Sequence, residues 1–247
     1  MVQQAVVGSV TIIRPVASRR VRAAQPDGTS VNTTRDTLLK ADELGRIELT
    51  ERGGVSVIRR DIGAARWWAR AFARRAAARE ARALAKLAGV DGVPSLLGWN
   101  GHELLRGYIA GAPMQQAQPR DRAYYRDALR LLAVLHRRGI VHNDLAKEPN
   151  WLVRSDGRPA LVDFQIAWTR GRRGALFRLL AREDLRHLLK HKRTYCPEAL
   201  SARQRTILDQ PAAHSRLWRA TGKRLYKLIA RRVFGYWDNE GQGRIRD

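Results

Sequence analysis

Short apolar segments bounded by turn residues occur throughout the first half of the chain. Segments of this length, rich in Leu, Ile and Val, are typical of β-strands. The segments that fit best are residues 37–39, 45–49, 55–59, 96–99 and 103–105. Asn100-Gly101, between the last two segments, is a favoured hairpin turn, and Gly53-Gly54 precedes the third. We therefore predict a curled antiparallel sheet in this half of the chain.

Longer segments repeat apolar residues at helical spacing. Residues 64–88 form the first of these, and a single apolar face is expected to include Trp68 and Phe72 near its start and Leu84 near its end. The remaining predicted elements are helices at 122–138 and after 175, and short strands at 151–153 and 160–162. The predicted order is strands, one helix, strands and then mostly helices.

The composition indicates a folded core with a strongly basic surface. Of the 247 residues, 44% are apolar, which suffices for one large domain or two small lobes and excludes a disordered or collagen-like chain. The 47 Lys and Arg exceed the 23 Asp and Glu, giving a formal net charge of +24, and 40 of these cations are Arg. Either biased codon usage or an anionic partner explains this excess. A single cysteine, Cys196, excludes an internal disulfide.

The two ends of the chain differ from its centre. Residues 1–35 mix a short apolar run with Pro, Gly and Arg, so we expect a mobile extension there rather than a secretory signal. Residues 213–247 include a basic amphipathic segment at 215–234, whose apolar face either docks on the protein or lies on an anionic membrane. Nucleic-acid binding ranks third, because no nucleic-acid-binding motif accompanies the segment. No apolar run of 18 residues occurs, so we expect no membrane-spanning helix.

Two polar segments carry the candidate chemistry. Asp144 and Asn150 lie in a loop after a predicted helix, and Asp163 lies at the end of an apolar strand. Oxygen ligands of this kind suit Mg²⁺, which binds one or two carboxylates together with substrate phosphates and water. A remaining carboxylate can take a proton from a hydroxyl group. The alternative is that these side chains only order a loop and a turn through hydrogen bonds to the backbone.

These two segments resemble a known family. Residues 142–150, His-Asn-Asp-Leu-Ala-Lys-Glu-Pro-Asn, and residues 161–165, Leu-Val-Asp-Phe-Gln, resemble the catalytic loop and the Asp-Phe-Gly metal motif of the protein-kinase-like superfamily. The resemblance covers about residues 37–192 and is closer to RIO-type atypical Ser/Thr kinases and lipopolysaccharide-core sugar kinases than to eukaryotic protein kinases. It implies an α+β, two-lobed fold: a small antiparallel-sheet N-lobe with one long helix, at 36–107, and a helical C-lobe, at 108–212.

The resemblance also implies a role for each motif residue. Asp144 would be the catalytic base, and Lys147 would contact the transferred phosphate. Asn150 and Asp163 would hold Mg²⁺ on the ATP phosphates. Asp184, on a later predicted helix, is similar to the aspartate that braces the catalytic loop in this family, although a solvated helix charge is an alternative.

The phosphate-binding part departs from the family pattern. The usual sheet lysine is missing, and Arg59 stands in its place, with Glu80 on the following helix as its expected ion-pair partner. Two alternatives rank below Arg59: Arg60, which strand alternation points to the opposite face, and Lys40, on the preceding hairpin. Gly45 resembles the last glycine of the glycine-rich loop that covers the nucleotide phosphates.

Together these features predict an ATP- and Mg²⁺-dependent phosphotransferase that moves a γ-phosphoryl group to a hydroxyl acceptor. The simplest form is a cytoplasmic Ser/Thr protein kinase, and the alternative is a kinase of sugar or lipid-linked acceptors at the inner face of the membrane. A catalytically weak pseudokinase or binding module is a further alternative. The missing lysine favours it, whereas the joint retention of Asp144, Asn150 and Asp163 opposes it.

Overall fold

The computed structural model describes residues 36–169 and 173–209 and has a mixed α+β architecture. Its contacts divide the chain into two compact units, with the boundary after Leu200. The second unit contains one described helix, α5 (Ala202–Asp209). Ser201 and Gln204 cap its start reciprocally, each accepting a hydrogen bond from the backbone amide of the other at 3.2 Å. All other described elements belong to the first unit.

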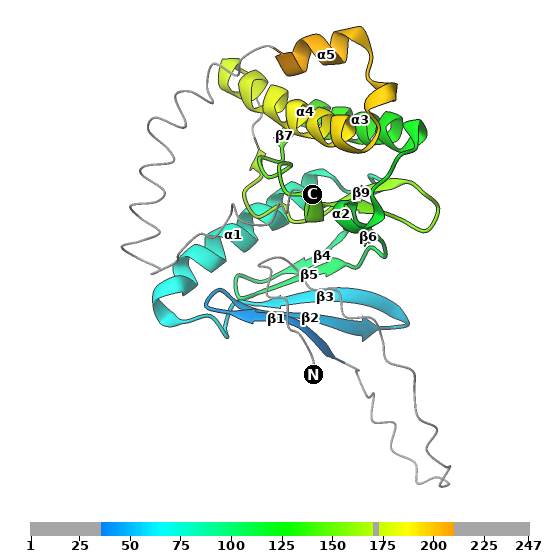
Figure 1. Ribbon diagram of the computed structural model, residues 1–247. Helices are drawn as coiled ribbons and strands as arrows, with labels where there is room; N and C mark the ends of the chain where they lie inside the picture. Colours follow the sequence, from blue (N-terminus) through cyan, green and yellow to red (C-terminus); the bar gives the residue numbers. More distant parts are fainter. Residues whose placement is uncertain (1–35, 170–172, 210–247) are drawn as a thin grey trace, which may run out of the picture. The chain divides into compact units, whose positions relative to one another are not determined.

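A five-stranded antiparallel sheet forms the first part of that unit (Figure 1). Its strands are, in spatial order, β1 (Thr37–Asp42), β2 (Gly45–Arg52), β3 (Val55–Asp61), β5 (Glu103–Gly107) and β4 (Leu96–Trp99). The five predicted strand segments all fall within these strands, so this prediction is confirmed. The turn between β4 and β5 is closed by Asn100, whose Oδ1 accepts hydrogen bonds from the amides of His102 and Glu103 at 2.9 and 2.7 Å.

Helix α1 (Trp67–Lys86) packs against this sheet through small side chains. Its buried alanines, among them Ala73, Ala77 and Ala81, recur every four residues and contact Ile62 and Leu104. The predicted apolar face is therefore wrong at its start, because Phe72 lies outside this alanine row and is 56% exposed.

The second part of the unit is mainly helical, with short strands between the helices. A three-stranded sheet, in the order β6-β8-β9, and a two-stranded β10-β7 pair complete it. The elements are β6 (Ala112–Pro113), α2 (Met114–Ala117), α3 (Arg122–Arg137), β7 (Ile140–Val141), the 3-10 helix η1 (Glu148–Asn150), β8 (Trp151–Val153), β9 (Pro159–Leu161), β10 (Trp168–Thr169), α4 (Ala175–Tyr195) and η2 (Pro197–Ala199).

The main hydrophobic core lies in this second part. It joins α3, α4 and the small sheets, and its largest fully buried side chains include Trp151, Tyr125 and Phe164. Trp151 and Phe164 flank the two polar segments that carry the candidate chemistry. The core therefore anchors the backbone on both sides of Asp163 and directly after Asn150.

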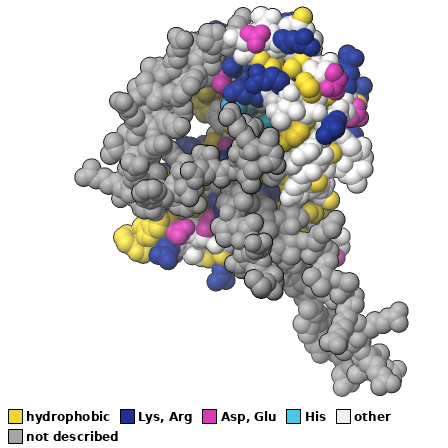
Figure 2. Space-filling model, viewed as in Figure 1, with side chains coloured by type: hydrophobic (Ala, Val, Ile, Leu, Met, Phe, Trp, Pro, Cys, Tyr) yellow, Lys and Arg dark blue, Asp and Glu magenta, His cyan; other side chains and the backbone are white. Residues whose placement is uncertain are grey.

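Basic side chains are prominent on the surface of α3 and α4. On the face shown in Figure 2, Lys and Arg side chains of the described residues gather in the upper part of the view. The exposed cations of the two helices include Arg122, Arg126, Arg130, Arg137, Arg178 and Arg182.

Some sequence-based predictions lie outside the described residues. They are the N-terminal extension at 1–35 and the basic segment at 215–234 within 213–247. Within residues 36–169 and 173–209, no helix is long and apolar enough to cross a bilayer.

Gly92 provides a test of how the loop before β4 supports the candidate site. Its carbonyl accepts a hydrogen bond from Leu161 of β9 at 2.8 Å, its φ is +80°, and a Cβ there would lie 2.8 Å from the Pro159 carbonyl oxygen. We predict that Gly92→Ala lowers the free energy of unfolding by about 3 kcal/mol. The cost of a left-handed backbone for alanine and the cost of the clash of its Cβ with Pro159 add together. Urea denaturation measures this change.

Gly89→Ala is the matched control for this variant. Gly89 also has a left-handed φ, +75°, but nothing lies within 4 Å of its added Cβ. Its substitution should cost only about 1 kcal/mol. Equal losses at the two glycines would contradict the inferred close packing of Gly92 against β9.

Candidate functional site

The loop between β7 and β8 holds three of the predicted site residues close together. The Lys147 ammonium lies 3.0 Å from Asp144 Oδ2. The Asn150 side-chain amide donates a hydrogen bond to the Asp144 main-chain carbonyl at 2.9 Å. This bond closes the loop across the six-residue interval between Asp144 and Asn150, and η1 accommodates the interval as a helical turn.

Asp163 is brought to the same loop by the strand that precedes it. The amide of Val162 donates to the Asn150 carbonyl at 3.0 Å, which fixes the start of the Asp163 segment against the end of the loop. Asp163 has a φ of +66°, and Asn143, the residue before Asp144, has a φ of +64°. Left-handed conformations are uncommon for residues other than glycine and are enriched at functional sites. Each candidate carboxylate thus lies at or next to such a position.

Asp184 of α4 fixes the backbone before Asp144. Its two carboxylate oxygens accept hydrogen bonds from the amides of His142 and Asn143, at 2.8 and 3.0 Å, and His136 Nε2 lies 3.3 Å from one of them. The Asp184 side chain is only 1% exposed. The predicted bracing role is therefore confirmed, and the alternative of a solvated helix charge is wrong.

Helix α4 contacts the loop at two further positions that the sequence did not reveal. His191 Nε2 donates to the Leu145 carbonyl at 2.7 Å, and the Tyr195 hydroxyl donates to Glu148 at 2.6 Å. Burial lowers the pKa of His191, and burial together with the Glu148 bond raises the pKa of Tyr195 to about 12. Because positions 184, 191 and 195 share one helix face, their spacing was the available signal.

His142 has a structural place in the loop. Its Nε2 donates to the Val162 carbonyl at 3.0 Å, and its ring packs against Phe164 with centroids 4.7 Å apart. The ring thereby contacts the residues on both sides of Asp163, namely the Val162 carbonyl and the Phe164 ring.

Arg59 does not pair with Glu80, so this prediction is wrong. Arg59 instead binds Glu48 at 2.9 Å and also Glu103. In the β2–β3 register Glu48 lies directly opposite Arg59, so both side chains project from the same face of the sheet. Strand alternation then points Arg60, not Arg59, toward the other face, which α1 covers.

Glu80 lies between two arginines, the buried Arg60 and the half-buried Arg106. Arg106 Nε of β5 is 3.1 Å from Glu80 Oε1, and Arg60 Nη1 is 3.8 Å from Glu80 Oε2. The Glu80 side chain is 2% exposed, and neither Glu80 Oε1 nor Arg60 Nη1 has a partner with hydrogen-bond geometry. Arg106 was missed by sequence reasoning, although its place opposite Ile58 in the β3–β5 register puts it on the Arg60 face.

Glu80 also connects the sheet side electrostatically with Asp163. Burial raises the pKa of Glu80, Arg106 and Arg60 oppose this increase, and the negative charge of Asp163 adds to it. The carboxylates of Glu80 and Asp163 are therefore close enough to repel each other. The Arg60 and Arg106 guanidinium groups supply the positive charge on the sheet side of this group.

Lys40 and Gly45 lie on the β1–β2 hairpin. Lys40 pairs with Asp42 at 2.8 Å, and the whole of β2 separates its strand from β3. Gly45 has a φ of +119°, and a Cβ there would lie 2.2 Å from the Asp61 carbonyl oxygen. Close packing of two strands is thus a sufficient reason for glycine at position 45.

The donor set fits a magnesium ion that completes its shell with substrate and water. Among the described residues, no group of three or more His, Cys, Asp or Glu side chains could hold a metal ion. Asn150 uses its side-chain nitrogen on the Asp144 carbonyl, which leaves its carboxamide oxygen as the group able to bind a cation beside the Asp163 carboxylate. Mg²⁺ commonly takes one or two protein oxygens and fills its other positions with phosphate and water.

Searches against protein-family models and against curated proteins found no matching family and no significant relative.

We predict that Asp184→Ala destabilises the fold and releases the loop. Loss of the carboxylate leaves the buried amide of His142 and the half-buried amide of Asn143 unpaired, which should lower the free energy of unfolding by about 3 kcal/mol. Hydrogen exchange at these two amides should accelerate in the milder variant Asp184→Asn, which retains one acceptor oxygen.

Asp127→Ala on α3 is the control for the loss of a carboxylate. Asp127 pairs with Arg126 and Arg130 at the surface, where ion pairs contribute little. Its removal should leave exchange at His142 and Asn143 unchanged. Unchanged exchange at those amides in Asp184→Asn would contradict the bracing role.

Proposed function

We propose that the chain is an ATP- and Mg²⁺-dependent phosphotransferase of protein-kinase-like fold that transfers a γ-phosphoryl group to a hydroxyl acceptor. In this proposal the five-stranded sheet with α1 is the N-lobe, and the part that begins near β6 is the helical C-lobe. The acceptor is most simply a protein Ser or Thr. A sugar or lipid-linked hydroxyl is accepted by the same chemistry.

The observation that carries the proposal is a series of interactions that links five polar groups from four segments of the chain. Asn150 contacts the main chain of Asp144, and its own carbonyl fixes the segment that leads to Asp163. Asp163 in turn lies within electrostatic reach of Glu80, which is the neighbour of Arg60. Carboxylates and a carboxamide for a metal ion, with a guanidinium for phosphate, are the groups that phosphoryl transfer requires.

Arg60 replaces Arg59 as the proposed phosphate contact. Arg59 is committed to two carboxylates on the opposite face of the sheet. Arg60 is buried, faces α1 and has an Nη1 atom without a hydrogen-bond partner. A guanidinium binds phosphate oxygens through paired N–H groups, and Glu80 orients it from behind.

Each loop residue has a proposed task. The oxygen of the acceptor hydroxyl forms a bond to the γ-phosphorus, and the bond between this phosphorus and the ADP leaving group breaks. Asp144 accepts the proton that the hydroxyl loses. Lys147, held beside Asp144, neutralises charge on the transferred group. Asn150 and Asp163 would bind Mg²⁺, which, when present, neutralises the nucleotide phosphates. Asp184, His191 and Tyr195 position the loop without touching the reactants.

Isosteric amide substitutions test the proposal. We predict that Asp144→Asn and Asp163→Asn each lower Mg²⁺-dependent transfer from labelled ATP at least about a hundredfold, because one loses the base and the other the charged metal ligand. The assay offers both a membrane and a soluble cell fraction as acceptors. As a control, the circular dichroism spectrum of each variant should match that of the wild type.

Asp156→Asn serves as the matched control. Asp156 lies in the exposed β8–β9 turn, and the amide oxygen of an Asn can still accept the bond from the Arg158 amide. This variant should transfer phosphate at the wild-type rate. Transfer that is unaffected by Asp144→Asn and Asp163→Asn would refute the enzyme proposal, and ATP binding without any transfer would favour the pseudokinase alternative.

A further inference from the structure

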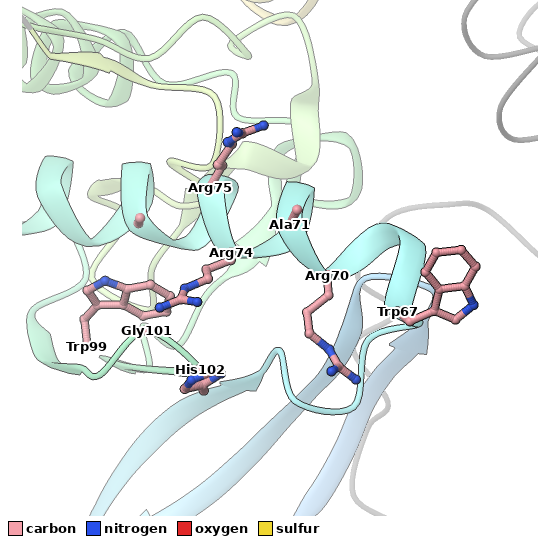
Figure 3. A pocket seen from close by; sticks show the side chains of 9 residues that line it. Trp67, Arg70, Ala71, Arg74, Arg75, Trp99, Gly101 and His102 are labelled. Carbon is pink, nitrogen blue, oxygen red and sulfur yellow. The ribbon is translucent and has the colours of Figure 1, made fainter.

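A surface pocket of about 640 Å³ lies between the first half of α1 and the β4–β5 turn (Figure 3). It includes none of the candidate catalytic residues. Its lining combines tryptophan and cationic side chains with small residues, and it comprises Trp67, Arg70, Ala71, Arg74, Arg75, Ala78, Trp99, Gly101 and His102. No Asp or Glu is among these residues, so the pocket attracts an anion rather than a cation.

The positions of the cations are defined by the local structure. Arg70 donates hydrogen bonds to the carbonyls of Gly63 and Ala65 at 3.3 and 3.2 Å. Arg74 extends over the β4–β5 turn, and a Cβ at Gly101 would lie only 3.1 Å from its Nη2 atom. Glycine at this turn therefore leaves room for the Arg74 guanidinium, which Figure 3 shows directed toward Trp99.

Large aromatic side chains project from the same end of α1. Trp67 is 83% exposed and Phe72 is 56% exposed, although both residue types normally bury most of their surface. Figure 3 shows the Trp67 indole at the start of α1, beyond the cations that line the pocket. Residues 62–79 contain five arginines and no acidic residue. Exposed aromatic rings among arginines are typical of helices that rest on membrane surfaces.

We propose that this end of α1, with the β4–β5 turn, is a docking surface for an anionic phospholipid bilayer. Arg70, Arg74 and His102, which Figure 3 shows on the same side of α1, face the lipid phosphates, and the pocket beside Arg74 receives one head group. The Trp67 and Phe72 rings enter the boundary between head groups and acyl chains, where aromatic side chains are favoured. This surface does not depend on the proposed phosphotransfer, and it lies within the described residues.

A single-stranded nucleic acid fits the same surface less well. Such ligands need a row of aromatic rings along the groove on which successive bases stack. Here Trp67 and Trp99 lie at opposite ends, as Figure 3 shows, and cations with small residues occupy the space between them.

Vesicle sedimentation with the full-length protein tests the proposal. We predict that the wild type binds phosphatidylcholine vesicles that contain phosphatidylglycerol and binds pure phosphatidylcholine vesicles far less. The variant Trp67→Ser/Arg74→Ala should lose about tenfold in affinity, because it removes one inserted ring and one cation near the surface. In the variant Trp67→Phe, the blue shift of tryptophan emission on vesicle binding should shrink while affinity is largely kept.

Val55→Ser/Arg52→Ala is the matched control. It removes one exposed apolar side chain and one exposed cation at the β2–β3 turn, and its affinity should stay within about twofold of the wild type. Equal binding by the two double variants would overturn the proposal. It would also be overturned by a loss of oligonucleotide binding without a loss of vesicle binding in Trp67→Ser/Arg74→Ala.

Discussion

The buried carboxylate of Asp184 is the constraint on which the candidate site depends. It holds two consecutive backbone amides directly before Asp144, one of which belongs to a residue with a left-handed φ. Such a conformation persists only when the surroundings determine it. Because Asp184 lies on a long helix that packs into the main core, the position of the loop follows from the packing of α4. His191 and Tyr195 extend the same support along the helix.

On the side of the candidate site that faces the five-stranded sheet, Glu80, Arg60 and Arg106 form a second cluster of charged side chains. Glu80 would be costly to bury alone, and Arg60 and Arg106 compensate it from two adjacent strands. These three side chains do not satisfy one another fully, because Arg60 Nη1 and Glu80 Oε1 are buried and lack hydrogen-bond partners. A phosphate oxygen can accept the hydrogen bond that Arg60 Nη1 lacks, whereas the Glu80 carboxylate, itself an acceptor, requires a donor instead.

Much of this architecture was predictable, and the failures have identifiable causes. The strands and the long helices α1, α3 and α4 followed from apolar periodicity, and the bracing aspartate followed from the resemblance to the protein-kinase-like superfamily. The choice of Arg59 failed because two adjacent arginines in a strand project to opposite faces, and only the partner strand decides which face α1 covers. The predicted position of Phe72 on the buried face was wrong because helical spacing does not distinguish large apolar side chains from small ones. Helix α1 packs closely against the sheet, and its buried row there consists of alanines. Arg106 depends on the pairing of β3 with β5, which local patterns do not encode, whereas the only local signal for His191 was its place on the same face of α4 as Asp184.

Calorimetric titration of ATP into the protein, with and without Mg²⁺, tests the central claim most directly. The proposed site of Asn150, Asp163 and Arg60 predicts that ATP binds, that Mg²⁺ strengthens this binding, and that Arg60→Ala weakens it more than Arg59→Ala does. Failure to bind ATP, or an affinity that neither Mg²⁺ nor Arg60→Ala alters, would contradict the proposal that these residues form a nucleotide site.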